Sequence, residues 1–185
     1  MRSLLFSCAV LLLTTATAPA SSLEVGFAGT LIGCETWILE PASWVDGTGP
    51  FQNRVGLGST MAEVAVVTDW SLPPPEMRRG NHFWRINSTL AAGYVLVVSD
   101  RLPICHITDG GNADLRPAIS AVLASADFGK RWEKVSSSKR RGLVSTQYRN
   151  REERQFTFLI SQPDDKHWKI DRLQVVVTAQ FDTAH

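Results

Sequence analysis

The sequence lacks the short motifs by which many enzymes and metal proteins are recognised. It contains only three cysteines, and no two of them have the Cys-x-x-Cys spacing of thioredoxin-type proteins. The four histidines are scattered, without the His-x-x-x-His or His-x-His spacing that places two metal ligands on one face. The chain also has no Gly-x-Ser-x-Gly elbow and no phosphate loop that ends in Gly-Lys-Ser/Thr. No motif therefore specifies a reaction, and we expect neither a metal nor a cofactor.

Long hydrophobic runs are also absent, except for one short run at the start of the chain. Arg2 precedes an apolar stretch from Leu4 to Leu13, and Ala18-Pro19-Ala20 follow it. This order is typical of a secretory signal peptide, and the run is shorter than the roughly 20 residues that a membrane span needs. We therefore predict a signal peptide over residues 1–20 and a mature chain that begins near Ser21. The expected location is periplasmic or extracellular with no transmembrane segment after cleavage, and a bacterial envelope is the setting that we favour.

Cleavage would remove Cys8 and leave Cys34 and Cys105. An even number of cysteines in an oxidising compartment is most simply explained by one disulfide bond. This bond would close a loop of about 70 residues and contribute roughly 4 kcal/mol to stability. A catalytic Cys105 is the alternative. It is disfavoured because neighbouring Cys105 and His106 would point to opposite faces of the strand predicted there.

The pattern of apolar residues predicts an α+β fold that is mainly antiparallel sheet. Residues 21–185 are enough for one small globular domain and too few for two. Alternation with a period of two is typical of strands that are buried on one face, and β-branched runs between turn residues also indicate strands. The predicted strands cover residues 23–32, 63–68, 94–99, 104–108, 144–148, 156–160 and 172–181. Turns over 100–103 and 150–154 would form two hairpins.

One principal amphipathic helix is predicted over about 114–128. Its apolar residues recur at the spacing of one helical face: Leu115, Ile119, Val122, Leu123 and Ala126. Asp114 can cap the first turn, Pro117 is tolerated there, and Gly129 can end the helix. We expect this helix to pack on the sheet that the later strands form.

Two irregular segments are predicted in the first half of the chain. A short helix after Pro41 would be broken by the Gly- and Pro-containing residues 46–50. Residues 70–81, with three consecutive prolines, indicate an exposed polyproline-like connection. This connection could separate a Trp-rich N-terminal lobe, residues 21–80, from an α+β part, residues 81–185, of the same domain.

Charge is separated along the chain, although the mature chain sums to zero. Residues 21–77 contain seven acids and one base, whereas residues 130–154 contain nine bases and three acids. The basic segment, with Lys139, Arg140 and Arg141, could attract an anionic envelope polymer, lipid headgroups or nucleic acid. We favour a solvated hairpin that the acidic half balances. Nucleic acid is not the expected partner, because no aromatic RNA-binding platform accompanies the bases.

Four of the six tryptophans lie in the N-terminal half: Trp37, Trp44, Trp70 and Trp84. Their rings could stack on sugars or peptide side chains, or they could fill the interior of an irregular lobe, which we favour. Together these patterns predict an exported, non-enzymatic protein that binds a cell-envelope component or another exported protein. The tryptophans and the basic residues are the candidate surfaces. The alternative is a small secreted hydrolase in which the fold brings His106 together with Asp109 or Asp114.

Overall fold

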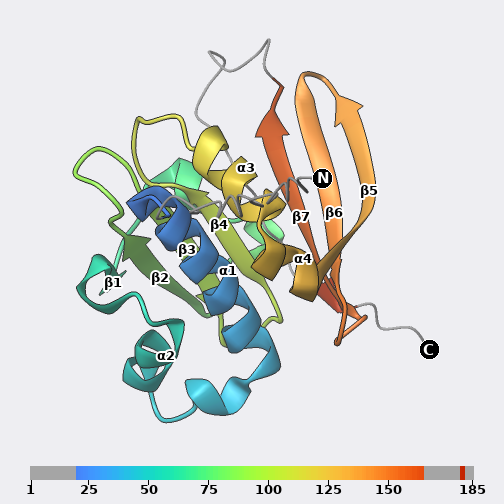
Figure 1. Ribbon diagram of the computed structural model, residues 1–185. Helices are drawn as coiled ribbons and strands as arrows, with labels where there is room; N and C mark the ends of the chain where they lie inside the picture. Colours follow the sequence, from blue (N-terminus) through green and yellow to red (C-terminus); the bar gives the residue numbers. More distant parts are fainter. Residues whose placement is uncertain (1–19, 165–179, 182–185) are drawn as a thin grey trace, which may run out of the picture.

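The computed structural model describes residues 20–164 and 180–181, which form an α+β fold with two antiparallel sheets. The first sheet has the order β1-β2-β3-β4 and the second the order β5-β6-β7-β8 (Figure 1). The strands of the first sheet are β1 (Met61–Val64), β2 (Asn81–Ile86), β3 (Tyr94–Ser99) and β4 (Cys105–Asp109). Those of the second are β5 (Trp132–Arg140), β6 (Leu143–Asn150), β7 (Phe156–Pro163) and β8 (Gln180–Phe181).

Helices cover one face of the first sheet. The α-helices are α1 (Ser22–Leu39), α2 (Thr48–Val55), α3 (Arg116–Ala124) and α4 (Ala126–Arg131). Short 3-10 turns are η1 (Pro41–Ser43), η2 (Gly58–Thr60), η3 (Asp69–Ser71) and η4 (Pro75–Met77). Helix α1 lies across β3 and β4, and α2 and α3 pack against α1 (Figure 1). Within the described ranges, no helix combines the length and the apolar character needed to span a membrane.

The strand predicted over residues 23–32 is wrong, because these residues begin helix α1. The alternation of Leu23, Val25 and Phe27 suggested a strand, yet Val25 is 50% exposed while Phe27 is fully buried. The buried side chains instead recur every three or four residues, as on one helical face: Phe27, Leu31, Cys34 and Trp37. Ser21 caps this helix, since its hydroxyl accepts a hydrogen bond from the Glu24 backbone N–H at 3.3 Å.

The helix predicted over 114–128 is present, but it is two helices and it is not the principal one. Ser125 has an extended backbone, ends α3 and accepts a hydrogen bond from the Phe128 N–H, so it also caps α4. Gly129 was expected to end the helix and instead lies inside α4. The longer α1 is the principal helix of the fold, because it covers the first sheet.

Four predicted strands are confirmed. Residues 94–99 and 104–108 form the β3–β4 hairpin, and residues 144–148 and 156–160 lie in β6 and β7. The strand predicted over 63–68 is shorter and shifted, since β1 covers Met61–Val64. The strand predicted over 172–181 lies outside the described residues, apart from β8.

The irregular first half contains more structure than its composition suggests. The short helix expected after Pro41 is the 3-10 turn η1. Helix α2 begins at Thr48, inside the segment that was expected only to break helices. The proline-rich connection includes the turns η3 and η4 rather than a continuous polyproline stretch. The strands on either side of it, β1 and β2, pair with each other in one sheet.

One hydrophobic cluster connects the first sheet, the helices and the second sheet. Phe128 of α4 packs edge-on against Tyr148 and Phe158, with ring centroids 5.1 and 6.1 Å away. Trp132 packs against Phe158 at 4.4 Å. Phe128 of α4 therefore makes the contact between this helical region and the later strands, and the contact is mainly aromatic. The apolar stripe that was expected to lie on those strands belongs to α3, which packs against α1 instead.

Candidate functional site

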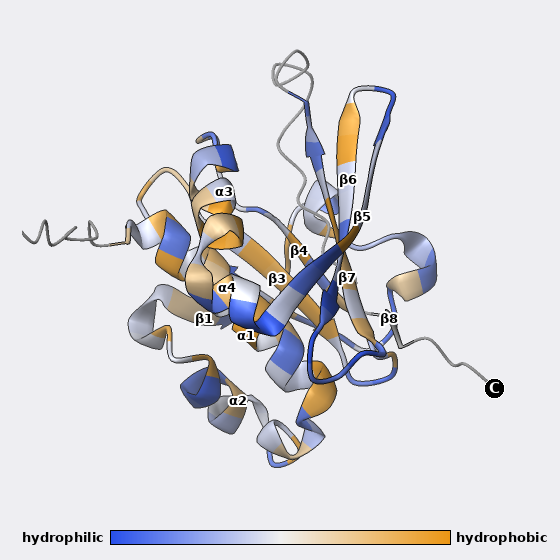
Figure 2. Cartoon of the chain, turned by 45° about the vertical axis from the view of Figure 1, so that its right-hand side comes forward, coloured by the Kyte–Doolittle hydropathy of each residue, from blue (hydrophilic) through white to orange (hydrophobic). Residues whose placement is uncertain are grey.

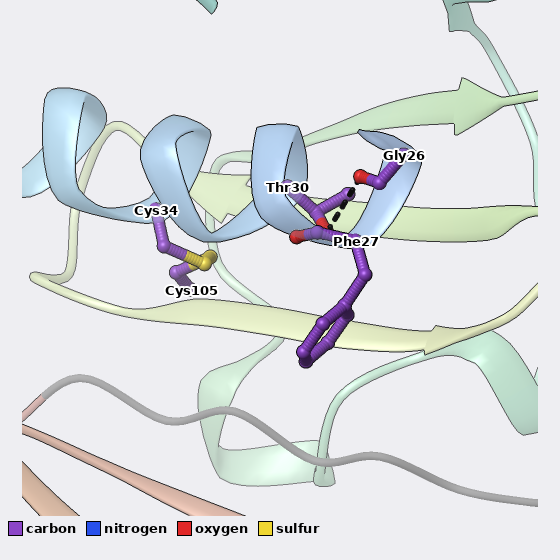
Figure 3. The surroundings of a disulfide bond; sticks show 5 residues. All are labelled: Gly26, Phe27, Thr30, Cys34 and Cys105. Atoms are coloured by element: carbon purple, nitrogen blue, oxygen red, sulfur yellow. Dashed lines mark hydrogen bonds between the residues drawn. A yellow bond between two sulfur atoms is a disulfide. The ribbon is translucent and has the colours of Figure 1, made fainter. Parts of the chain in front are cut away.

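A disulfide bond between Cys34 of α1 and Cys105 of β4 fixes the principal helix to the first sheet (Figure 3). Both side chains are buried, and their Cα atoms are 5.4 Å apart, within the usual range for a disulfide. One turn before Cys34, the buried Thr30 hydroxyl donates to the Phe27 and Gly26 carbonyls (Figure 3). The predicted pairing is thus confirmed. The bond holds the C-terminal half of α1 close to the β3–β4 turn.

Two of the four candidate tryptophans form a stacked pair at the end of α1. The rings of Trp37 and Trp44 are parallel within 6°, and their centroids are 4.3 Å apart. The Trp37 indole N–H donates to the Ser99 carbonyl at 2.7 Å, and that of Trp44 donates to the Trp37 carbonyl at 2.8 Å. The backbone therefore satisfies both indole nitrogens. What the pair offers to a ligand is the apolar surface of Trp44, which is only partly buried.

This pair lines a surface pocket of about 210 Å³, which we call the indole pocket. Ile38, Pro41 and the two indoles form one wall, and residues 99–103 of the β3–β4 turn form the other. The second wall supplies the Asp100 carboxylate and the Arg101 guanidinium, which lie 3.9 Å apart at their nearest atoms. An apolar aromatic wall opposite a few charged groups is typical of small-ligand sites.

The buried Ser99 hydroxyl holds the turn that forms this second wall. It donates to the Arg79 carbonyl at 2.5 Å and accepts from the Arg101 and Leu102 backbone N–H groups, each at 3.0 Å. The pocket is thus built on ordered backbone at both walls, through the disulfide on α1 and through Ser99 on the turn.

His82 lies beside this pocket, between two carboxylates. Its Nδ1 is 3.4 Å from Glu63 Oε1, its Nε2 is 3.6 Å from Asp100 Oδ2, and its ring is 5.4 Å from that of Trp37. Thr48 donates to the other Glu63 oxygen at 2.8 Å. Within the described residues, no group of three His, Cys, Asp or Glu side chains is arranged to hold a metal ion. The His82 ring instead lies between these two carboxylates and the Trp37 indole.

The structure does not bring the proposed hydrolase residues together. His106 and Asp109 are three positions apart on β4, so their side chains leave opposite faces of the strand. Asp114 binds its neighbour Arg116 through two side-chain hydrogen bonds of 2.9 and 2.7 Å. Burial lowers the pKa of His106 to about 4, although a hydrogen bond to the Ser71 backbone opposes this shift. His106 is therefore a neutral side chain in the interior near neutral pH.

The other two candidate tryptophans lie apart from the indole pocket. Trp84 is fully buried in β2 and packs against Phe51, which itself packs edge-on against Trp37. Trp70 is 51% exposed and lines a smaller hollow of about 120 Å³ with Arg85 and Asn112. The expectation that the indoles fill the interior therefore holds for Trp37 and Trp84, while Trp44 and Trp70 reach the surface.

The candidate basic residues lie in the second sheet. Near the end of this sheet where β5 begins, acids neutralise two of the basic side chains. Arg131 pairs with Glu35 of α1, and Arg154 pairs with Glu133 at 3.1 Å. Lys139 pairs with the buried Asp164 at 2.6 Å. Arg140 and Arg141 are exposed and make no ion pair within the part of the chain that the structure describes. Among these partners Glu35 belongs to the acidic segment 21–77, so that segment balances the hairpin region at Arg131, whereas Glu133 and Asp164 lie outside it.

Sequence reasoning missed part of this site. Glu63 lies in β1, His82 lies in β2, and the adjacent Ser99 and Asp100 lie at the end of β3. Nothing in the local sequence links these three segments. The stacking of Trp44 on Trp37 had a usable signal, since the two flank Pro41 at the end of an apolar helix. Comparison with known protein families, with curated proteins and with solved structures found no match for this chain.

Proposed function

We propose that this chain is an exported, non-enzymatic binding protein, and that its indole pocket holds a sugar ring of a cell-envelope component. The pocket carries the proposal, because it combines the partly buried indole of Trp44 with a carboxylate and a guanidinium on one turn. Sugars present apolar C–H faces that stack on an indole and hydroxyl groups that bind charged side chains.

The size of the pocket limits what it can hold. About 210 Å³ is below the usual range of 300–1,000 Å³ for sites that enclose a whole drug-sized ligand. One ring of a larger molecule fits this space better than a complete oligosaccharide or peptide. The pocket therefore suits recognition of a repeating or terminal unit of an envelope polymer that extends away from the protein.

Two further observations support export. The predicted signal peptide ends just before Ser21, which is the N-cap of α1. Cleavage there would therefore leave the first helix complete. The disulfide between Cys34 and Cys105 is the kind of bond that persists in oxidising compartments and is rare in the cytosol.

Titration with an N-acetylglucosamine trimer, followed through the indole N–H resonances in NMR spectra, tests the sugar assignment. We expect the Trp44 and Trp37 resonances to shift, and Trp44→Ala to weaken binding at least about tenfold. Trp70→Ala is the matched control, since it removes an exposed indole outside the pocket, and it should bind as the parent does.

Three results would contradict the proposal in distinguishable ways. Equal losses in the two variants would show that binding is not specific to the pocket. Shifts caused by a proline-rich peptide and not by the sugar would identify an exported protein as the partner. Hydrolysis of the trimer would make the chain an enzyme.

A further inference from the structure

The β5–β6 hairpin carries positive charge at its tip, where Lys139 pairs with Asp164 and the next two residues, Arg140 and Arg141, make no ion pair among the described residues. Its outer part, residues 136–146, contains Lys139, Arg140 and Arg141 and no acid. Strand β5 is exposed from Lys134 to its end. The hairpin rises beyond α3, whereas η1 and α2, near the acids Glu40 and Asp46, lie at the opposite end of the molecule (Figure 1).

The turn itself places an arginine where conformation disfavours one. Arg140 pairs with Leu143, so Arg141 and Gly142 form a two-residue turn, with φ values of 51° and 77°. Such a turn requires positive φ at both residues and usually contains Asn, Asp or Gly. Arg141 is the one non-glycine residue with positive φ among those that the structure describes. Strain of this kind often marks a functional position, and here it places a charge at the outermost point of the hairpin.

Apolar side chains are also exposed on the hairpin. Leu143 is 46% exposed and follows the turn directly, and Val135 is 41% exposed at a bulge nearer the base of β5. Figure 2 shows the hydrophobic upper part of β6 beside the hydrophilic turn and the end of β5. A cationic turn next to exposed aliphatic side chains is amphipathic on the scale of a few residues. This combination suits the boundary between lipid headgroups and acyl chains.

We propose that the tip of the β5–β6 hairpin docks on an anionic lipid surface. Arg140 and Arg141 would bind the phosphate groups, and Leu143 would enter the interface between headgroups and acyl chains. A lipid surface fits better than nucleic acid, because residues 136–146 contain no aromatic ring on which bases could stack. The docking is independent of the sugar proposal, since the indole pocket belongs to the first sheet and to α1.

Co-sedimentation of the mature chain with phosphatidylglycerol vesicles tests this docking, with phosphatidylcholine vesicles as the neutral reference. We expect binding to the anionic vesicles that weakens as salt is added, because the charges at the tip are exposed and are screened. Arg140→Gln and Arg141→Asn should each weaken binding about fivefold, in line with the effect of one basic residue near an anionic membrane. Leu143→Ser should weaken it about threefold.

Two of the variants separate docking from misfolding and from general charge attraction. Arg141→Asn replaces a strained residue by one that favours the turn, so its thermal stability should not fall while its vesicle binding does. Arg54→Gln is the matched control, since it removes one exposed positive charge from α2, at the other end of the molecule.

The proposal is overturned if the mature chain binds neutral and anionic vesicles alike, or binds neither at low salt. It is equally overturned if Arg54→Gln weakens binding as much as Arg141→Asn does. Binding to heparin or to inorganic phosphate without binding to vesicles would identify a soluble anion as the partner instead. The hairpin variants should still bind the N-acetylglucosamine trimer, so failure of one proposal does not imply failure of the other.

Discussion

His106 shows how one buried polar residue links stability to pH. It lies on β4 with its side chain almost completely buried, and its Nδ1 has no hydrogen-bond partner among the described residues. Desolvation lowers the pKa of the folded-state imidazole to about 4, from an ordinary value of about 6.5. The unfolded chain therefore binds a proton between these two values when the folded chain does not. Acidification through this range must favour unfolding.

We predict that the free energy of unfolding falls by about 2 kcal/mol from this residue between pH 7 and pH 5. His106→Phe keeps a ring of similar volume and removes the titration, so its unfolding free energy should fall by that much less over the same range. Urea denaturation at a series of pH values measures both slopes. An unchanged slope in the variant would show that another group causes the acid sensitivity.

Replacing glycine by alanine should change the free energy of unfolding in opposite directions at two positions, Gly93 and Gly129. A Cβ atom at Gly93, before β3, would lie 2.0 Å from the Ile86 carbonyl oxygen of β2. Backbone must move to relieve this contact, so Gly93→Ala should lower the free energy of unfolding by about 2 kcal/mol or more. Gly129 lies in α4, where a Cβ atom would have no other atom within 4 Å, so Gly129→Ala should raise it by about 1 kcal/mol.

Thermal or urea denaturation of the two alanine variants beside the parent measures both effects. Because the substitution is the same in each, a general effect of alanine on the unfolded chain cannot produce opposite signs. A neutral Gly93→Ala would mean that β2 and the start of β3 are not as close as the structure places them.

Strands with a clear sequence pattern were predictable, whereas helix α1, whose apolar residues imitate a strand, was not. Strands β6 and β7 were found because their sequences alternate with a period of two, and β7 buries every second residue from Phe156 to Ile160. Strands β3 and β4 were found as runs of β-branched residues between turns, and both are buried along their whole length. Helix α1 is apolar on most sides, so its helical period is weak, and Leu23, Val25 and Phe27 imitate a strand. The glycines at 26, 29 and 33, all on its buried face, were the signal that could have corrected this prediction.

The break at Ser125 illustrates a different limit. Apolar residues keep a helical spacing from Leu115 to Ala126, so periodicity alone predicts one continuous helix. The chain instead turns at Ser125, and this turn directs Phe128 into the aromatic cluster with Tyr148 and Phe158. Tertiary packing determines where the helix is interrupted, and a single sequence does not reveal it.

For the molecule as a whole, pairing of the cysteines was predictable from their number, whereas the site was not. With Cys8 placed in the predicted signal peptide, Cys34 and Cys105 allow one intramolecular bond, and the structure has it between α1 and β4. The long loop that this bond closes is expected to give roughly 4 kcal/mol, a large share of the stability of a small domain. The indole pocket depends on residues that only the folded chain brings together, such as Trp44, Asp100 and His82.

The prediction of export and the presence of the Cys34–Cys105 disulfide depend on each other, because the bond needs an oxidising compartment in which it can form and persist. Both can be checked at once by the intact mass of the product from the exported fraction, alkylated without reduction. We predict a chain that starts near Ser21, is lighter than its reduced form by two hydrogen atoms and takes up no alkyl group. A full-length product with free Cys34 and Cys105 thiols would contradict both the export and the bond that holds α1 to the first sheet.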